Sequence, residues 1–458
     1  MRLRSVLVAV LAACVAPASD GSAPGMRAVR IEVRGVVLAG DSPGIRVSGL
    51  AAGEAVRLHS LRPLGEGGRL LHAWAEVRAD AHGRVDLDAA APLAGSYKHP
   101  DGLGLLWSGY LRGDPTLPAG LPDGLYDLAG QPGGAIVLRV ERSGSVVATR
   151  SFRLAQESAD TRFESVVRPG LNGVFAARAG ARRLPTVIVL HGSEGGSTAR
   201  ARAAAAQYAA RGFAAFALNY FAGAAERLPE VPTVAINLPV ETIERAHEWL
   251  AGRQEVDPLR IGVVGASKGA ELALVAASRY EWIKAVVGCV PSDVVWQGYG
   301  REISPEERAS SWTVDGLPLP YVPLYRESSE RPFDYVDNTA RYERSRRDRP
   351  TEAAAARIPI ERSNARLLLI GSDRDEVWAS GAMVRNIEQA MARSGKAGNV
   401  RLLVSPTAGH LVCGVGSAPI HLFSLQSGDP AAKNVTDEGE AAVRSQRASL
   451  EFLRSTLR

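Results

Sequence analysis

The feature that most constrains this chain is a strand, a tight turn and a helix that follow one another within residues 260–279. The turn, Gly265-Ala266-Ser267-Lys268-Gly269, has the pattern G-x-S-x-G. The β-branched run 261–264 before it has the length of a buried strand, and the Ala- and Leu-rich run 270–278 after it favours helix. In this context the pattern predicts a nucleophile elbow, where side chains at positions 265 and 269 would collide with backbone. The alternative is a glycine-rich turn with an incidental serine.

Charge and composition narrow the class of protein. The net charge of +5 is spread over 458 residues without a basic run, which indicates a solvated surface and no nucleic-acid partner. The hydrophobic content of 46% is enough for the cores of two or three domains.

The N-terminus predicts export, with residues 1–18 as a signal peptide. A positively charged start is followed by the apolar run 5–16, which is too short to span a bilayer as a stable anchor. Two interpretations stay open: cleavage after Ala18 in an A-x-A site, or a bacterial lipobox that ends at a lipidated Cys14. The first predicts a periplasmic or extracellular protein. The second predicts a lipoprotein attached to a membrane only through Cys14, and a misread signal would leave the protein cytoplasmic.

The remaining cysteines are Cys289 and Cys413, each beside an apolar segment. They pair only if the fold brings them together, and their spacing does not decide this. The sequence has no Cys or His spacing typical of a metal site, no phosphate-binding loop and no dinucleotide fingerprint. We therefore predict neither a metal nor a cofactor.

The first third of the chain is typical of β structure. Residues 19–27 are rich in Ser, Gly, Ala and Pro and resemble a tether. Residues 28–155 alternate apolar and polar positions between turn-rich spacers, which predicts an all-β, immunoglobulin-like sandwich. Arg142-Ser143-Gly144 marks a hairpin. For Trp107, in a segment dense in glycine and aromatic residues, we favour a place in the core over a contact with substrate.

After a polar boundary near residues 155–164, the pattern changes to strands that alternate with helices. This pattern predicts a mostly parallel sheet with flanking helices over residues 165–458. Residues 291–358, rich in Pro, Arg, Glu and Tyr, interrupt it and predict a lid-like insertion. The expected strands are residues 186–190, 213–220, 261–264, 285–290, 365–370 and 400–404, and the expected helices are residues 199–211, closed by Gly212, and residues 241–252.

A serine nucleophile requires a base that takes its proton and an acid that orients the base. In this kind of sheet the chain order is serine, acid, histidine. The loop after the strand 365–370 offers Asp373, Asp375 and Glu376, and its spacing favours Asp375, with Asp373 second. His410 follows the last strand, which predicts the base; the alternative is an ordinary packed histidine.

Hydrolysis of an acyl group also requires two N–H donors for the oxyanion. One is expected from the backbone of Lys268, the residue after the nucleophile. The other is expected from the glycine-rich loop 191–196, from the N–H of Ser193 or Glu194.

These residues resemble the acyl-CoA thioesterase / bile acid-CoA:amino acid N-acyltransferase (BAAT) family, over about residues 30–455. In the C-terminal part the similar segments are Arg211-Gly212-Phe213, Leu218-Asn219-Tyr220-Phe221, Gly265-Ala266-Ser267-Lys268-Gly269-Ala270-Glu271, Val290-Pro291-Ser292-Asp293-Val294-Val295-Trp296, Ile358-Pro359-Ile360-Glu361, Asp375-Glu376-Val377-Trp378-Ala379-Ser380 and Ala408-Gly409-His410. In the N-terminal part they are Gly95-Ser96-Tyr97 and Gly104-Leu105-Leu106-Trp107-Ser108. After His410 the family usually has a Pro/Tyr-rich segment, whereas this chain has Leu411-Val412-Cys413-Gly414.

The resemblance implies an α/β-hydrolase domain behind a β-sandwich, with Ser267, Asp375 and His410 as the catalytic triad. Members with a cysteine nucleophile transfer acyl groups to amino acids, and members with serine hydrolyse thioesters, so Ser267 implies an acyl-CoA thioesterase-like hydrolase. Because acyl-CoA is cytosolic whereas the N-terminus predicts export, two alternatives stay open. One is an extracytoplasmic carboxylesterase or dienelactone-hydrolase-like enzyme. The other is a non-catalytic, lipid-anchored binding protein.

Overall fold

The computed structural model describes residues 28–65, 69–222, 226–299, 308–325, 338–414 and 435–458. The predicted signal peptide, the tether and the candidate lipidation site Cys14 lie outside these residues. Within them, no helix is both long enough and apolar enough to cross a membrane.

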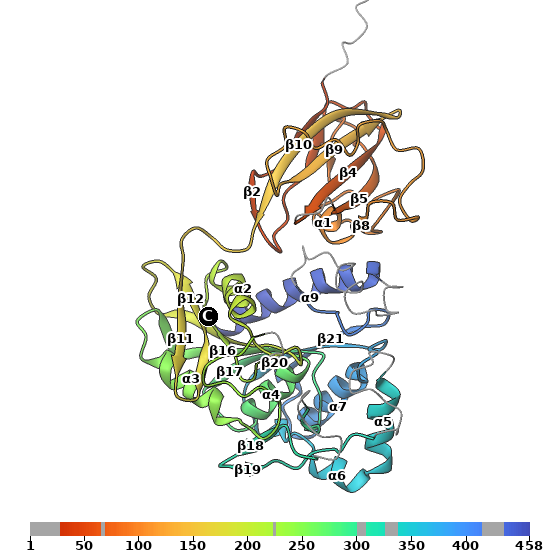
Figure 1. Ribbon diagram of the computed structural model, residues 1–458. Coiled ribbons are helices and arrows are strands. Elements are labelled where there is room, and N and C mark those ends of the chain that lie inside the picture. Colours follow the sequence, from red (N-terminus) through yellow and green to blue (C-terminus); the bar gives the residue numbers. More distant parts are fainter. Residues whose placement is uncertain (1–27, 66–68, 223–225, 300–307, 326–337, 415–434) are drawn as a thin grey trace, which may run out of the picture.

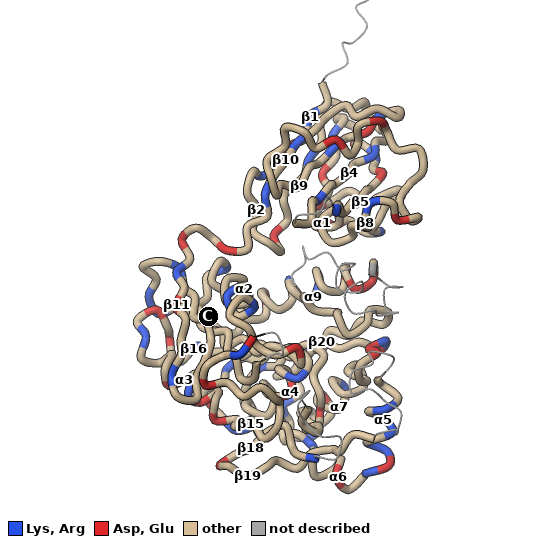
Figure 2. The backbone as a smooth tube through the Cα atoms, viewed as in Figure 1, with Lys and Arg blue, Asp and Glu red and all other residues tan. Residues whose placement is uncertain are grey.

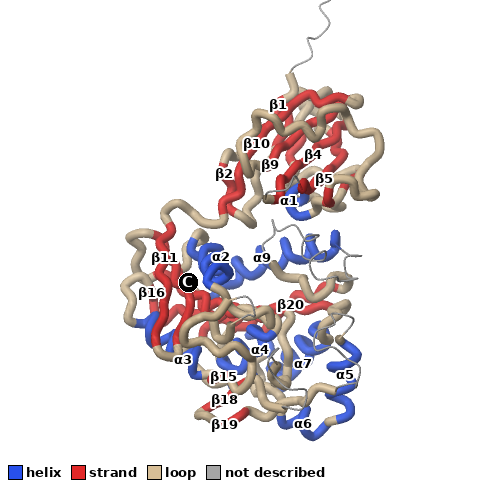
Figure 3. The backbone as a smooth tube through the Cα atoms, in the orientation of Figure 1, coloured by secondary structure: helices blue, strands red, loops and turns tan. Residues whose placement is uncertain are grey.

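The N-terminal part is a β-sandwich of two sheets (Figures 1 and 3). The smaller sheet has the order β1 (Arg30–Glu32), β3 (Arg46–Ser48), β6 (Val85–Asp86). The larger has the order β2 (Val36–Leu38), β10 (Ser145–Ala155), β9 (Ile136–Arg142), β4 (Ala55–Leu64), β5 (Arg69–Arg78), β7 (Ala94–Gly95), with β8 (Tyr110–Leu111) also paired to β5.

Both sheets contribute to one apolar core, in which Val47 and Val85 meet Leu58 and Phe152. Trp107 ends the short helix α1 (Gly104–Trp107) and is 1% exposed, so the expectation of a core position is confirmed. The expected hairpin is also present, because β9 and β10 pair antiparallel around Ser143, which has φ 49°.

The C-terminal part is built on one eight-stranded sheet. Its order is β11 (Thr161–Arg168), β12 (Leu171–Arg178), β14 (Ala214–Leu218), β13 (Leu184–Leu190), β16 (Val256–Ala266), β17 (Ile283–Cys289), β20 (Arg366–Ser372), β21 (Val400–Ser405). Every pair from β14 to β21 is parallel, and β11 and β12 join antiparallel. This order, with helices on both faces, is the α/β-hydrolase fold, as expected.

The helices cover the sheet because each presents an apolar face to it. α2 (Thr198–Ala209) and α9 (Val435–Thr456) share one core with one face. α3 (Glu241–Ala251), α4 (Lys268–Ala277) and α7 (Ser380–Arg393) pack on the other. The hairpin β11–β12, α7 and α9 have no counterpart among the elements expected from the sequence.

The insertion between β17 and β20 contains the small strands β18 (Trp312–Val314) and β19 (Leu317–Pro318), followed by α5 (Thr339–Asp348) and α6 (Pro350–Ala355). β18 lies between β19 and β15 (Leu238–Pro239) and pairs with both. The 3₁₀ turns η1 (Ile360–Arg362) and η2 (Ala397–Asn399) lie beside α7. The side chains of Trp296 and Trp312 are fully buried, so the described part of the insertion is built into the domain. Its movement as a lid stays a prediction.

Helix α9 joins the two parts (Figure 1). Val443 belongs to the core of the sandwich, whereas Phe452 and Leu453 belong to the core of the α/β domain. Gly439 packs so tightly on Trp107 that an added Cβ would lie 2.1 Å from its ring. Figure 2 shows acidic and basic residues interspersed along the chain in both parts.

Candidate active site

The G-x-S-x-G turn lies between β16 and α4, with Ser267 at the first position before the helix. Ser267 has φ 52° and ψ −117°, a left-handed conformation that costs energy in a residue with a side chain. A Cβ at Gly265 would lie 2.3 Å from the carbonyl oxygen of Gly269, and one at Gly269 would lie 2.3 Å from that of His191. Both glycines are therefore required for the close packing that holds the strained serine.

The loop after β21 brings His410 to the loop after β20. His410 Nδ1 lies 2.8 Å from Asp375 Oδ1, and because a carboxylate only accepts, Nδ1 donates the hydrogen bond. The same oxygen accepts from the backbone N–H groups of Val377 (3.0 Å) and Trp378 (3.2 Å), which fixes the carboxylate. His410 Nε2 makes no hydrogen bond within the described chain and is left to receive a proton.

The electrostatic environment favours a charged imidazole at His410. Burial lowers its pKa, but the charge and hydrogen bond of Asp375, followed by the charges of Glu376 and Glu194, raise the pKa above the ordinary value. This arrangement suits a general base, since a carboxylate that stabilises the imidazolium assists proton removal from a hydroxyl.

The other two carboxylates of the Asp375 loop take different positions. Asp373 forms an ion pair with Arg385 (2.7 and 2.9 Å) at the surface, which lowers the pKa of Asp373. Glu376 accepts the backbone N–H of His410 at 3.0 Å, and burial raises its pKa. The structure therefore brings Asp375, and not Asp373, to the imidazole.

The three candidate triad residues follow β16, β20 and β21, whose carboxyl ends lie at one edge of the sheet. The N–H of Ser267 donates to the carbonyl of Cys289 on the intervening strand β17, at 2.8 Å. Cys289 in turn forms a disulfide with Cys413, three residues after His410, which answers the question left open by the sequence. Ser267 and His410 share this edge but are not hydrogen bonded to each other within the described residues.

The candidate oxyanion donors lie around the same turn. The backbone N–H groups of Lys268, Ser193 and Glu194 have no hydrogen-bond partner in the part of the chain that the structure describes. The loop that holds Ser193 and Glu194 begins at His191, whose carbonyl is packed against Gly269. Glu194 Oε1 accepts the N–H of Gly192 at 3.0 Å and so closes this loop on itself. The loop and the elbow are thus in contact, as an oxyanion hole requires.

The side chain of Lys268 reveals a feature that the sequence analysis did not find. It is buried, and its Nζ lies 2.8 Å from Glu271 Oε1 and 2.9 Å from Oε2. Glu271 also accepts from Trp312 Nε1 at 2.7 Å. The spacing i, i+3 between Lys268 and Glu271 was the signal available in the sequence, but it is equally common on exposed helix faces.

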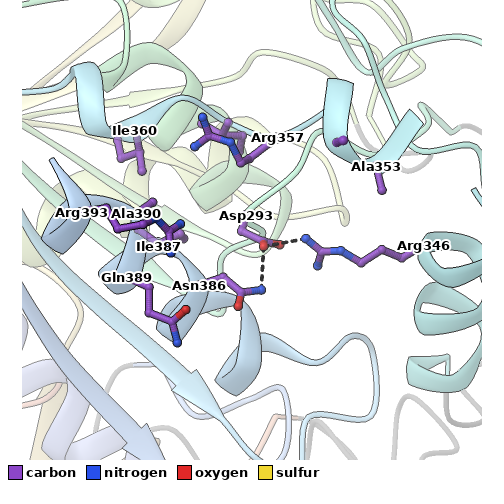
Figure 4. A pocket seen from close by; sticks show the side chains of 12 residues that line it. Asp293, Arg346, Ala353, Arg357, Ile360, Asn386, Ile387, Gln389, Ala390 and Arg393 are labelled. Carbon is purple, nitrogen blue, oxygen red and sulfur yellow. Dashed lines mark hydrogen bonds and ion pairs between the residues drawn. The ribbon is translucent and has the colours of Figure 1, made fainter. Parts of the chain in front are cut away.

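A pocket of about 280 Å³ lies between α7 and the insertion, away from these residues (Figure 4). Asp293 lines it and is held by Arg346 Nη2 (2.6 Å) and Asn386 Nδ2 (2.9 Å). None of the candidate triad or oxyanion residues lines this pocket. Across the described residues, no group of three His, Cys, Asp or Glu side chains is arranged to hold a metal ion.

Comparisons with known proteins find matches to one family in both domains. Residues 238–427 match the family described as BAAT / Acyl-CoA thioester hydrolase C terminal, and residues 42–114 match the Acyl-CoA thioester hydrolase/BAAT N-terminal region. Similar proteins include acyl-coenzyme A thioesterase 1 of Rattus norvegicus, 26% identical over 382 residues, with 81% of this chain and 82% of that protein covered. Another is acyl-coenzyme A thioesterase 5 of Mus musculus, 28% identical over 385 residues, with the same coverage of 81% and 82%.

Among solved structures, a putative dienelactone hydrolase from Klebsiella pneumoniae is 15% identical, with a TM-score of 0.40, over 64% of this chain and 98% of that one. The N-terminal family match lies in the β-sandwich and the C-terminal match lies in the α/β domain, as the resemblance of the sequence segments implied. From these matches and the fold, we conclude that the chain belongs to the acyl-CoA thioester hydrolase/BAAT family.

Proposed function

We propose that this protein is a serine-dependent hydrolase of thioesters or esters that works through an acyl-enzyme on Ser267. The observation that carries the proposal is the 2.8 Å hydrogen bond between His410 and Asp375, at the sheet edge that also holds the strained serine. The relatives named acyl-coenzyme A thioesterases support a thioester as the substrate. Serine in place of cysteine at the elbow supports transfer of the acyl group to water.

In the proposed reaction, His410 Nε2 takes the proton of Ser267 as the hydroxyl oxygen attacks the acyl carbon. The negative oxygen that forms is stabilised by the N–H of Lys268 and by the N–H of Ser193 or Glu194. The carbon–sulfur or carbon–oxygen bond then breaks, and the leaving group takes the proton from His410. In the second half, His410 removes a proton from water as the water oxygen attacks the acyl carbon. The bond between the acyl carbon and the Ser267 oxygen then breaks, Ser267 takes the proton from His410, and the carboxylic acid leaves.

Labelling with a fluorophosphonate tests the proposal. We expect the wild-type chain to take up one label per molecule and Ser267→Ala to take up none, with kcat lower by about 10⁵-fold or more. Ser278→Ala, at the end of the same helix, serves as the matched control and should keep both label and turnover. A wild-type protein that takes up no label would contradict the proposal and favour a non-catalytic binding protein.

The disulfide favours a specific second candidate, an extracytoplasmic ester hydrolase. Disulfides persist in oxidising compartments and are rare in the cytosol, where acyl-CoA is found. The disulfide between Cys289 and Cys413 therefore supports the export that the N-terminal sequence predicts. Turnover of palmitoyl-CoA against p-nitrophenyl esters separates the two substrates. Mass spectrometry of the mature N-terminus separates cleavage after Ala18 from lipidation at Cys14, and an uncleaved N-terminus would contradict export.

A further inference from the structure

We infer that Glu271 is a positioning residue that sets the relative placement of the two oxyanion-hole segments, the elbow and the loop 191–196. The inference rests on the proposed hydrolase function and deepens it, since the carboxylate of Glu271 bonds to Lys268, Trp296 and Trp312 and not to a triad side chain. It assigns a role to a buried charge that the catalytic steps leave unused.

The first step is the set of contacts around the carboxylate. Glu271 lies one turn after Ser267 on α4, and its residue is fully buried. Its two oxygens receive the ammonium of Lys268 at 2.8 and 2.9 Å. Oε1 also receives the indole N–H of Trp312 at 2.7 Å and the backbone N–H of Trp296 at 3.3 Å. One carboxylate therefore ties the elbow helix to two separate segments of the insertion.

The second step leads from Trp312 to the other oxyanion segment. The ring of Trp312 packs on Tyr220, with the ring centres 5.8 Å apart. Tyr220 stacks on His191 at 4.1 Å, with the rings 4° from parallel, and its hydroxyl donates to the carbonyl of His191 at 2.6 Å. His191 begins the loop that holds Ser193 and Glu194. A continuous path of packed rings and hydrogen bonds thus joins Glu271 to this loop.

The third step concerns the free energy of burying this ion pair, which is unfavourable for each of the two charges. Burial lowers the pKa of Lys268 and raises the pKa of Glu271, so the surroundings oppose both charges. A buried ion pair contributes little net stability compared with apolar side chains of similar volume. What a carboxylate adds is direction, because it accepts from several donors at fixed angles. At an oxyanion hole, small changes in donor position have large effects on rate.

Two substitutions test the inference. Glu271→Gln keeps the shape but loses the charge, and one amide nitrogen then faces the ammonium of Lys268. Trp312→Phe keeps a ring to pack on Tyr220 but removes the indole donor. We expect kcat to fall about 10- to 100-fold in the first and about 3- to 10-fold in the second, with KM changed less than about twofold, because only the transition state carries the oxyanion. The double variant should lose less than the product of the two factors, since both act through one carboxylate.

The affinity of a trifluoromethyl ketone provides a readout that a merely structural role would not move. This inhibitor adds to a serine and forms an oxyanion, so its Ki should rise by the same factor as kcat/KM falls. Glu248→Gln, on the exposed face of α3, is the matched control and should leave kcat and Ki unchanged. Unchanged kcat and Ki in Trp312→Phe would overturn the inference even if Glu271→Gln fails to fold. A wild-type chain without fluorophosphonate labelling would overturn the proposed function, and this inference with it.

Discussion

Each domain contains a histidine hydrogen bonded to a carboxylate, and the two pairs behave in opposite ways. In the sandwich, His59 Nε2 lies 2.8 Å from Glu141 Oε2. In the α/β domain, His410 Nδ1 lies 2.8 Å from Asp375 Oδ1. Burial lowers the pKa of His59 to about 3, whereas the pKa of His410 is raised above its ordinary value. The distance within the pair therefore does not decide whether the histidine can act as a base.

The neighbours of each pair explain the difference. Around His59, the charges of Arg57 and Arg139 add to burial and oppose protonation. Around His410, the charges of Asp375, Glu376 and Glu194 overcome the effect of burial. The nearby arginines thus disfavour a charged His59, whereas Asp375, with smaller contributions from Glu376 and Glu194, favours a charged His410.

Hydrogen bonding separates the two pairs in a second way. His59 Nδ1 accepts from His72 Nε2 at 2.9 Å, and His72 Nδ1 lies 3.0 Å from the hydroxyl of Tyr126. The direction follows from Glu141, which only accepts and so fixes the tautomer of each ring. Both ring nitrogens of His59 and both of His72 are hydrogen bonded, whereas His410 Nε2 makes no hydrogen bond to the described residues. The hydrogen bonds therefore favour a structural role for the sandwich pair and agree with the catalytic role proposed for the pair in the α/β domain.

The largest expected effect comes from deleting one imidazole from each domain. His410→Ala should lower kcat by about 10⁴-fold or more while the midpoint of thermal unfolding changes little. His59→Ala should leave kcat within about twofold and lower the free energy of unfolding by about 2–4 kcal/mol, because it leaves a cavity and buried unpaired groups. Steady-state kinetics and urea unfolding of both variants provide the check. Equal losses of kcat would remove the distinction between the pairs.

The second test uses pH, which should affect the domains through different histidines. In the proposed reaction the neutral form of His410 acts as the base. Because its pKa is raised, kcat/KM should fall about tenfold per pH unit below a midpoint above 6.5. Conversely, the stability that the protonated His410 contributes is present below pH 6.5 and is lost as pH rises through the folded pKa. Asp375→Asn should move the midpoint of kcat/KM to lower pH.

In the sandwich the sign of the stability change is reversed. Burial lowers the pKa of both His59 and His72 to about 3, so the unfolded chain takes up protons below pH 6.5 that the folded chain does not. The sandwich should therefore lose stability as pH falls from about 6.5 toward 3. Hydrogen exchange of β4 and β5 in the full chain, measured by mass spectrometry, should show less protection over this window. Protection that is independent of pH there would contradict the assignment of neutral, buried imidazoles.

A smaller loss of activity is expected from breaking the disulfide Cys289–Cys413, which lies close to His410 in the chain. Cys413→Ser should lower kcat only about two- to fivefold, because Asp375 and Glu376 still hold His410. Stability should fall by about 4–5 kcal/mol, since the disulfide closes a loop of 124 residues. Thermal unfolding with and without dithiothreitol measures the second effect. Sensitivity of the His59 network to the reductant would show that the two domains do not unfold independently.

The parts of the site predicted from the sequence are those fixed by position at strand ends. Ser267, Asp375 and His410 each follow a strand of a parallel sheet, and the order of the strands is enough to bring them to one edge. Glu271 and Trp312 could not be connected in this way, because they are 41 residues apart and meet only after the insertion has folded. The pair of His59 and Glu141 likewise depends on the register of β4 with β9, across 82 residues.

The missed secondary structure has similar causes. The predicted polar boundary, residues 155–164, overlaps the start of β11, because β11 carries charged side chains on its exposed face at the edge of the sheet. β12 had no counterpart among the predicted strands. Helix α9 shows no single apolar stripe toward one partner, since its side chains divide between two cores. Patterns that assume one buried face per element fail where an element is an edge or a bridge.

That division of α9 has a consequence for how the protein is made. A ribosome releases the sandwich and the strands of the α/β sheet before α9, yet Val443 fills one core and Phe452 and Leu453 fill the other. The apolar cores of both domains are therefore complete only after α9 has been synthesised. Until then, the face of Trp107 that packs against Gly439 is not covered by this helix. During synthesis the nascent chain therefore exposes apolar surface in both domains. We expect its folding to depend more on chaperones that bind apolar surface than the folding of a protein whose domains fold one after the other.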